Sequence, residues 1–232
     1  MKTPFRHNWK AAAWNQFQKN HNIAVFSIPF PKKDLPPSSR VLQSQLIPEI
    51  KNTDVPGVFE LKIRDVIIGT PRIKNVNFDD SYAPTADPVT IKIQLSLACG
   101  RGYITAVIDV KNVFQNTIAS PAQRIYVKAS KLYMEWASQT FDTKFDKNLD
   151  YIRQMFNSNQ GTKDAGNLWY TLIKDIILKY GMIRCTVDHA YFVKQLQDGS
   201  FIMMCIATDD LLVSCAKLHY FPRLGFIPQT IL

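Results

Sequence analysis

The sequence predicts an α+β fold, in which hairpins build an antiparallel sheet and a few helices pack against it. Two observations carry this prediction. Residues 163–180 place apolar side chains on one face at helical spacing and end before Gly181, a residue type common just after helices. Residues 190–196, 201–207 and 211–216 are three apolar runs joined by short polar turns, the pattern of consecutive β-hairpins.

The N-terminal part is expected to form one helix, a short strand, a loop rich in Pro and Ser, and two strands around a turn. Asn8 is a residue type that caps helices, and Pro56-Gly57 is typical of a tight turn between strands. The predicted ranges are, in order, 9–21, 23–28, 29–39, 41–50 and 58–68.

Residues 88–99 carry two contradictory signals. Asp87-Pro88 indicates the start of a helix, because Asp caps helices and Pro is tolerated at the first helical position. In contrast, five aliphatic residues from Val89 to Leu97 alternate with other side chains, which favours a strand. The residues alone leave this segment open. The next apolar segment, residues 104–110, is predicted to be a strand that contains one carboxylate, Asp109.

Composition narrows the class of protein. The chain has 232 residues and a formal net charge of +9, from 28 Lys and Arg against 19 Asp and Glu. A hydrophobic content of 46% excludes a disordered protein, and no apolar run reaches the ~18 residues of a membrane span. With no apolar leader, we expect an intracellular protein, cytoplasmic or nuclear and not secreted. The basic charge favours a polyanionic partner, most commonly nucleic acid.

Three aspartates are candidates for chemistry. Asp209 and Asp210 lie between two apolar strands, and Asp109 ends a third. Three carboxylates on neighbouring strands suit two Mg²⁺ ions that clamp the attacking and leaving oxygens in phosphoryl transfer. A polar turn at Asp209-Asp210 and an ion pair of Asp109 with Lys111 are the simpler alternatives. The pattern of residues leaves both open.

Five segments resemble, in order, signature blocks of copia-type retrotransposon reverse transcriptases. FDDSYAPTADPVTIK (78–92) resembles ETFAPVAxxTTIR, and AVIDVKNVFQN (106–116) resembles QLDVKNAFLNG. GTKDAGNLWY (161–170), VDHAYF (187–192) and ATDDL (207–211) are similar to YG(L/T)KQAxRxWY, ADHSLF and YVDDIL. Their common order and spacing within residues 58–216 make the resemblance specific.

The resemblance implies an RNA-directed DNA polymerase with the fingers and palm of a right-hand polymerase, an antiparallel palm sheet backed by helices, and no thumb. It also implies a helix over residues 88–99. Asp109, Asp209 and Asp210 are then expected to be the catalytic and metal-binding residues, holding two Mg²⁺ ions, with Mn²⁺ as a substitute. The expected partners are an RNA or DNA template–primer and a dNTP; no membrane is expected, and the oligomeric state is not indicated.

The resemblance also implies residues that bind the nucleotide. Lys62 and Arg64 match a fingers block whose cations contact the triphosphate, with a solvated strand face as the alternative. Phe114 matches an aromatic position that packs under the sugar and disfavours a 2′-hydroxyl, with core packing as the alternative. Asp164 replaces a Gln that helps hold the nucleotide, so its carboxylate would repel a triphosphate unless neutralised. Ala207 replaces a Tyr that contacts the primer end.

Three parts are expected along the chain: an N-terminal fingers-side extension with a Pro-rich linker (1–57), the fingers and palm (58–216) and an atypical tail (217–232). Because polymerases of this family continue into a thumb and RNase H, we expect a fragment of a retrotransposon polyprotein that is weakly active or inactive alone. The alternatives are a non-catalytic remnant that binds nucleic acid and a structural remnant without a partner.

Overall fold

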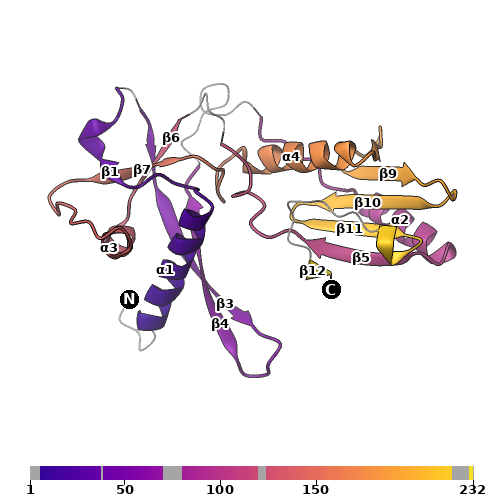
Figure 1. Ribbon diagram of the computed structural model, residues 1–232, viewed down its shortest axis with the longest axis horizontal. Helices are drawn as coiled ribbons and strands as arrows, with labels where there is room; N and C mark the ends of the chain where they lie inside the picture. The colour runs from indigo at the N-terminus through magenta and orange to yellow at the C-terminus, as the bar shows by residue number, and fades with distance from the viewer. Residues whose placement is uncertain (1–5, 38, 70–79, 120–123, 221–229, 232) are drawn as a thin grey trace. The chain divides into compact units, whose positions relative to one another are not determined.

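The computed structural model describes residues 6–37, 39–69, 80–119, 124–220 and 230–231 (Figure 1). The start of the block at 78–92 and most of the tail at 217–232 lie outside these residues. The chain divides into two compact units, each built from distant segments. Unit 1 comprises Met1–Asp80 and Phe114–Ala165, and unit 2 comprises Ser81–Val113 and Gly166–Leu232. Helices mixed with mostly antiparallel sheets confirm the predicted combination of α and β structure.

In unit 1, the first helix packs on a long hairpin. Helix α1 (Arg6–Asn22) contacts β4 (Phe59–Ile67), which pairs with β3 (Ser44–Asn52) over its whole length. A third partner is α3 (Lys131–Thr140), a helix that the sequence analysis did not predict. Side chains from all three elements close one apolar core, whose fully buried members include Phe17, Ile63 and Trp136. The predictions of the first helix and of the hairpin are confirmed.

A four-stranded sheet completes unit 1. Its order is β1 (Phe30–Pro31), β7 (Tyr151–Met155), β6 (Ile125–Lys128) and β2 (Val41–Leu42). The segment expected to be a loop therefore contains β1, which the short helix η1 (Lys32–Asp34) follows. The strand predicted over 23–28 is wrong. Ala24 adopts a left-handed φ of 52°, which interrupts extended backbone, and only Phe26 forms an isolated bridge.

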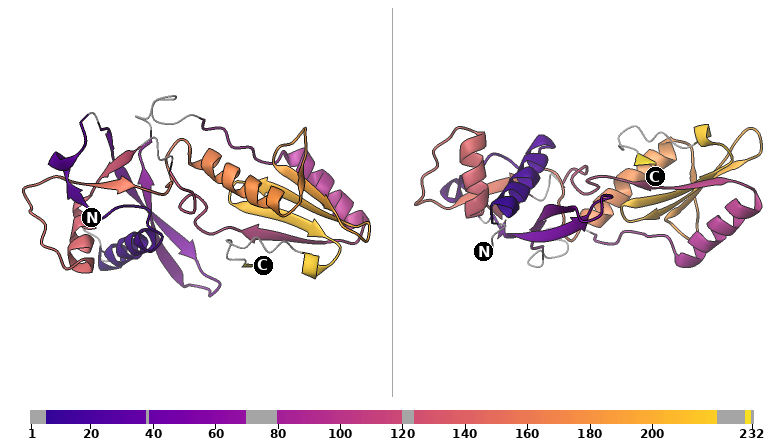
Figure 2. Two further views of the ribbon diagram at one scale, coloured as in Figure 1. Left: turned by 45° about the horizontal axis from the view of Figure 1, so that its top comes forward. Right: turned by 90° about the horizontal axis from the view of Figure 1, so that it is seen from below.

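Unit 2 is a six-stranded sheet with helices against it (Figure 2). Its strands follow the order β12-β5-β11-β10-β9-β8, and every pairing is antiparallel. The two predicted hairpins are confirmed as β9–β10 and β10–β11. The bounds are β5 (Ile104–Asp109), β8 (Ile183–Arg184), β9 (Tyr191–Gln195), β10 (Phe201–Ala207), β11 (Asp210–Cys215) and β12 (Thr230–Ile231), with a short helix η2 at Leu218–Tyr220.

Helices α2 (Pro88–Gly100) and α4 (Ala165–Lys179) pack on opposite faces of this sheet. On one face, the Gln94 amide of α2 donates to the Ser214 hydroxyl at 3.0 Å. On the other, the Lys194 ammonium donates to the carbonyl of Tyr180, just after α4, at 2.6 Å. None of the described helices has the length and apolarity that crossing a membrane requires.

The helix over residues 88–99, implied by the resemblance, is confirmed as α2. The Asp87 carboxylate accepts the Val89 N–H at 2.7 Å, and Pro88 occupies the first helical position. The alternation that favoured a strand is misleading here, because the buried residues of α2 are Gln94 and Ala98. Four of the alternating aliphatic side chains are exposed instead: Val89, Ile93, Leu95 and Leu97.

Candidate active site

Two of the three predicted catalytic carboxylates are cross-strand neighbours. Asp109, the last residue of β5, lies directly opposite Asp210, the first residue of β11. Opposite residues of an antiparallel pair share one face, with Cβ atoms ~4.5–5.5 Å apart. Both residues are exposed. The strand register therefore presents two carboxylates side by side at one end of the unit 2 sheet.

Asp209 lies in the turn beside this pair. Ala207 and Asp210 are paired across the β10–β11 hairpin, so Thr208 and Asp209 form its two-residue tip. The Asp209 carbonyl accepts the N–H of Val110 at 3.0 Å, which ties the tip to the residue after β5. All three predicted aspartates thus gather at the same corner of unit 2, as the sequence analysis expected of neighbouring strands.

The pKa of Asp210 reflects both its burial and the negative charges at this corner. Partial burial raises the pKa of the Asp210 carboxyl, and the negative charges of Asp209 and Asp109 raise this pKa further. Each of these effects disfavours the charged form of the carboxyl. Binding of a cation or a proton to these carboxylates is therefore favourable, because it neutralises part of their negative charge.

The donor set fits a divalent cation that substrate helps to hold. Within the described part of the chain, no group of three or more His, Cys, Asp and Glu side chains is already arranged to hold a metal ion. Mg²⁺ does not need such a cage, because it commonly takes one or two carboxylates and completes its shell with water and substrate phosphates. Asp109 and Asp210 are two neighbouring carboxylates of this kind, and a cation would relieve the repulsion that adds to the effect of burial on the pKa of Asp210.

Trp169 is a neighbour of this corner to which the sequence analysis gave no role. Its indole Nε1–H donates to the Thr208 carbonyl at 2.7 Å, and its side chain is 3% exposed. Thr208 itself has a left-handed φ of 58°. In the sequence, the only indication of a role for Trp169 is that it lies in the block at 161–170 that resembles the family. Nothing in the residues themselves indicates that this block contacts the β10–β11 turn.

The predicted triphosphate contacts, Lys62 and Arg64, lie on one face of β4 in unit 1. Both are partly exposed, whereas the alternate residues Ile63 and Asp65 are buried. Arg64 forms an ion pair with Glu49 of the neighbouring strand at 3.0 Å. The pKa of Lys62 is lowered, first by burial and then by the positive charges of Lys51 and Arg64, against which Glu49 acts. This face therefore has an excess of positive charge.

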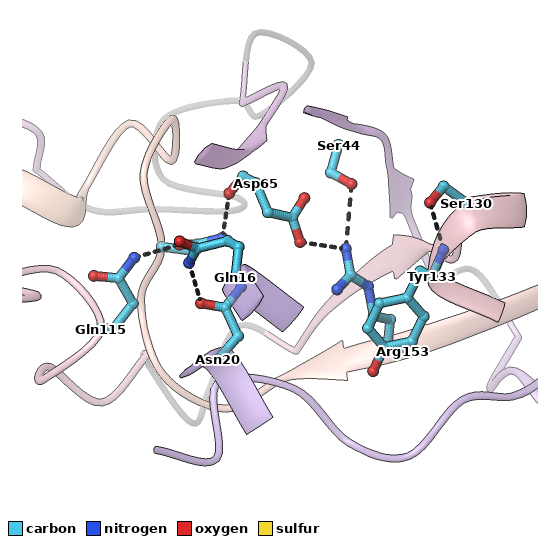
Figure 3. Close-up of polar contacts among 9 residues, drawn as sticks. Gln16, Asn20, Ser44, Asp65, Gln115, Ser130, Tyr133 and Arg153 are labelled. Atoms are coloured by element: carbon cyan, nitrogen blue, oxygen red, sulfur yellow. Dashed lines mark hydrogen bonds and ion pairs between the residues drawn. The ribbon is translucent and has the colours of Figure 1, made fainter. Parts of the chain in front are cut away.

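Behind this face lies a buried ion pair (Figure 3). Nη2 of Arg153 is 2.9 Å from Oδ2 of Asp65, and both side chains are 1% exposed. The same nitrogen donates to the Ser44 hydroxyl at 3.2 Å. The guanidinium lies over the rings of Phe26 and Tyr133, 4.0 and 4.2 Å from their centroids. These contacts join β4 to β7 and determine which face of β4 carries Lys62 and Arg64.

Asn159 links β4 to the segment that carries Phe114. Its amide nitrogen donates to the Asp65 carbonyl at 2.8 Å, and its amide oxygen accepts from Gln115 at 2.9 Å. Phe114 is half-buried, and its carbonyl accepts the Thr117 hydroxyl at 2.6 Å. The contacts of Phe114 with a sugar stay a prediction, as do the triphosphate contacts of Lys62 and Arg64.

Asp164 differs from the other predicted nucleotide residues in its burial. Its side chain is 6% exposed, whereas Lys62 and Arg64 reach solvent. Asp164 follows a point where two backbone segments lie close together. There the backbone carbonyl of Gln160 accepts the Ile67 N–H at 2.8 Å. Gly161 has a φ of 89°, and a Cβ there would lie 2.0 Å from the Ile67 carbonyl oxygen. A role of Asp164 in nucleotide binding stays a prediction.

The predicted site residues thus form two groups. Asp109, Asp209 and Asp210 belong to unit 2, and Lys62, Arg64, Phe114 and Asp164 belong to unit 1. A cavity of about 910 Å³ also opens in unit 1, between α3 and the residues before β7. None of the predicted site residues lines it; its walls include Met134, Phe145 and Tyr151.

Comparison with known proteins finds a reverse transcriptase family model and several retrotransposon polyproteins. A family model described as "Reverse transcriptase (RNA-dependent DNA polymerase)" matches residues 30–222. The chain is 22% identical over 180 residues to the retrovirus-related Pol polyprotein from transposon TNT 1-94 of Nicotiana tabacum. This match covers 78% of this chain and 13% of that polyprotein. The corresponding polyproteins from transposons RE2 and RE1 of Arabidopsis thaliana are 24% and 23% identical, over 77% and 66% of this chain and 11% and 10% of their own lengths. The chain therefore spans about a tenth of these relatives.

Proposed function

The chain belongs to the reverse transcriptase (RNA-dependent DNA polymerase) family of copia-type retrotransposons, and on this premise we propose that unit 1 is the fingers and unit 2 the palm of a template-directed polymerase. The observation that carries the proposal is the pairing of Asp109 with Asp210 beside the turn of Asp209. This corner gathers carboxylates from the tip and one strand of a hairpin and from a strand distant in sequence, an arrangement that suits two-metal phosphoryl transfer.

The reaction joins a dNTP to a primer. The primer 3′-hydroxyl attacks the α-phosphate, the new phosphodiester bond forms, and pyrophosphate leaves with the electrons of the broken bond. Asp109 and Asp210, with Asp209 next to them, would hold the Mg²⁺ ions, for which Mn²⁺ can substitute. A divalent cation there supplies a lower pKa for the primer hydroxyl and neutralises charge that develops on the phosphate.

The fingers supply the nucleotide contacts in this proposal. Lys62 and Arg64 contact the triphosphate, because their face of β4 has an excess of positive charge that phosphate oxygens can offset. Phe114 packs against the sugar, and Asn159 holds its segment against β4. The template–primer is bound mainly through its phosphates, in keeping with a net charge of +9, so its affinity falls steeply with salt.

A primer-extension assay tests the proposal. The unmodified chain, oligo(dT) annealed to poly(rA), and dTTP are combined with Mg²⁺ or Mn²⁺. We expect slow extension that falls at least ~100-fold in Asp109→Asn, because a neutral amide cannot replace an ionised metal ligand. Asp175→Asn is the matched control, since this exposed aspartate lies on α4 and pairs with Lys174. Equal extension by the Asp109 and Asp175 variants would contradict the assignment of the site.

A second candidate is a non-catalytic domain that binds nucleic acid. Two observations favour it: a buried acid, Asp164, stands where the family has Gln, and Ala207 stands where the family has Tyr. This candidate predicts filter binding of the same primer–template, weakened by salt, with no extension in either metal. Extension that depends on Asp109 would exclude it.

A further inference from the structure

The tip of the β10–β11 hairpin has an unusual backbone. Thr208 has a φ of 58°, in the left-handed region that β-branched residues rarely adopt, because their Cβ atoms crowd the backbone there. Such a conformation persists only where surrounding contacts hold it. The residue after it is Asp209, so whatever holds Thr208 also sets the backbone from which the Asp209 carboxylate projects.

Two hydrogen bonds hold the tip, one on each of its carbonyl groups. The Trp169 indole donates to the Thr208 carbonyl at 2.7 Å, and the Val110 N–H donates to the Asp209 carbonyl at 3.0 Å. The first comes from α4 and the second from the residue that follows β5. The two carbonyls of the strained tip are therefore bound from two different elements of unit 2.

The indole is a well-fixed donor. Trp169 is 3% exposed, and the next turns of the same helix are anchored by Ile173 and Ile177, both fully buried. An aromatic ring held in this way has little freedom to turn its N–H elsewhere. Its adjacent residue makes a useful contrast: the Tyr170 hydroxyl donates to the His189 carbonyl, also at 2.7 Å, but that carbonyl is not part of the hairpin tip.

We propose that Trp169 is a positioning residue, whose indole N–H keeps Thr208 in its left-handed conformation and so aligns Asp209 with Asp109 and Asp210. This inference rests on the proposed function for the role of the three aspartates. It goes beyond that function in giving the block at 161–170 a specific task at the hairpin tip. Trp169 itself touches neither metal nor substrate.

A double-mutant cycle tests whether Trp169 holds the tip. Thr208→Gly removes the left-handed penalty, so it stabilises the tip only while the tip is held in that conformation. After Trp169→Phe, which keeps the ring and removes the N–H, the tip relaxes and Thr208→Gly brings no such gain. We expect the folding equilibrium constants from urea unfolding to be non-additive by about five-fold. Additive effects would overturn the proposal.

Tyr170→Phe is the matched control in the same cycle. It removes a hydrogen bond of the same length from the same helix to a backbone carbonyl, but not to the tip. We expect its effect to be additive with Thr208→Gly. A cycle in which Tyr170→Phe couples to Thr208→Gly as strongly as Trp169→Phe does would overturn the proposal, because the coupling would then belong to α4 as a whole.

Mn²⁺ binding tests whether the held tip matters for the aspartates. Free Mn²⁺ is measured by electron paramagnetic resonance during titration of the full chain. We expect Trp169→Phe to weaken Mn²⁺ binding about ten-fold, the usual effect of losing a contact that orients a ligand, and Tyr170→Phe to change it less than two-fold. Unchanged affinity in Trp169→Phe overturns the positioning role. If the unmodified chain binds no Mn²⁺, the proposed function fails, and the unfolding cycle alone decides whether Trp169 holds the tip.

Discussion

Asp65 in unit 1 and Asp210 in unit 2 are both strand aspartates, but their surroundings are opposite. Asp65 is 1% exposed and meets the Arg153 guanidinium at 2.9 Å, under two aromatic rings. Asp210 is exposed and has Asp109 directly across the hydrogen-bonded ladder. Burial of a lone carboxylate is costly, so Asp65 depends on its partner. An exposed carboxylate tolerates like charges because water and salt screen them.

The two arrangements indicate different roles for the same chemical group. In unit 1, a carboxylate and a cation satisfy each other and join β4 to β7, so little of their charge is available to a ligand. In unit 2, partial burial and the negative charges of Asp209 and Asp109 raise the pKa of Asp210, and the charge of these neighbouring carboxylates is available to a cation. We therefore expect substitutions of charged residues to alter mainly stability in unit 1 and mainly binding in unit 2.

The largest effect is expected from Arg153→Met, which leaves Asp65 buried without its partner. We expect a loss of about 3–5 kcal/mol in the free energy of unfolding, measured in urea by circular dichroism. Lys128→Met is the control, because its ion pair with Asp150 has a similar length, 3.0 Å, but side chains about half exposed; it should cost less than about 1 kcal/mol. Hydrogen exchange should show lost protection in β4 and β7. Equal losses for both variants would contradict the comparison.

The next effect concerns two glycines with similar backbone angles. Gly161 of unit 1 has a φ of 89° and no room for a Cβ, whereas Gly199 of unit 2 has a φ of 79° and open space around it. We expect Gly161→Ala to cost more than about 2 kcal/mol, from backbone strain plus the clash with Ile67, and Gly199→Ala to cost about 1 kcal/mol, from strain alone. Thermal unfolding of both variants measures the difference, and a larger loss for Gly199→Ala would refute it.

The smallest effect on stability is expected from Asp210→Asn, which should raise the free energy of unfolding, whereas the preceding substitutions lower it. Since the folded-state pKa of Asp210 lies above the ordinary Asp value of 3.8, the folded chain binds more protons than the unfolded chain between these two pKa values. Stability therefore falls as pH rises through this window, and the cost of burying the charged carboxyl beside Asp209 and Asp109 is fully present above it. We expect the variant to be more stable than the unmodified chain by about 0.5 kcal/mol at pH 7.

The pH dependence of that difference is the check on its cause. The gain from Asp210→Asn should shrink as pH falls through this window, because protonation of Asp210 then removes the same buried and repelled charge. Urea unfolding of both chains at pH 7 and near pH 4 measures it. A gain that is the same at both pH values would show that the amide stabilises the hairpin for a reason other than charge.

Local patterns predicted much of unit 2 and of the first hairpin. Short turns between apolar runs specify hairpins, because that signal acts within a few residues. For residues 88–99, the cap signal of Asp87-Pro88 conflicted with the apolar alternation, and only the resemblance to the family indicated the helix. Helix α3 was not predicted, although Ser130 caps it and its buried residues include Tyr133 and Trp136 at helical spacing. The cap and this spacing are therefore a local signal for α3 in the sequence itself.

Other features depend on partners that are distant along the chain. From the sequence, an arginine in a strand is expected to be exposed. The burial of Arg153 is explained only by its ion pair with Asp65, 88 residues away. The candidate site shows the same limit. Three aspartates and their blocks were identified from sequence, but the register that places Asp210 opposite Asp109, and the indole bond to Thr208, depend on tertiary packing.

The division of each unit into two separate chain segments has a consequence for biosynthesis. On the ribosome, β4 is made 88 residues before the arginine that neutralises Asp65, and β5 is made about a hundred residues before its partner β11. In the meantime, an unpaired strand edge and an uncompensated carboxylate are exposed. Such long-range closures are slow and leave nascent chains prone to aggregation. We expect the newly made polypeptide to need chaperone binding until β11 has emerged.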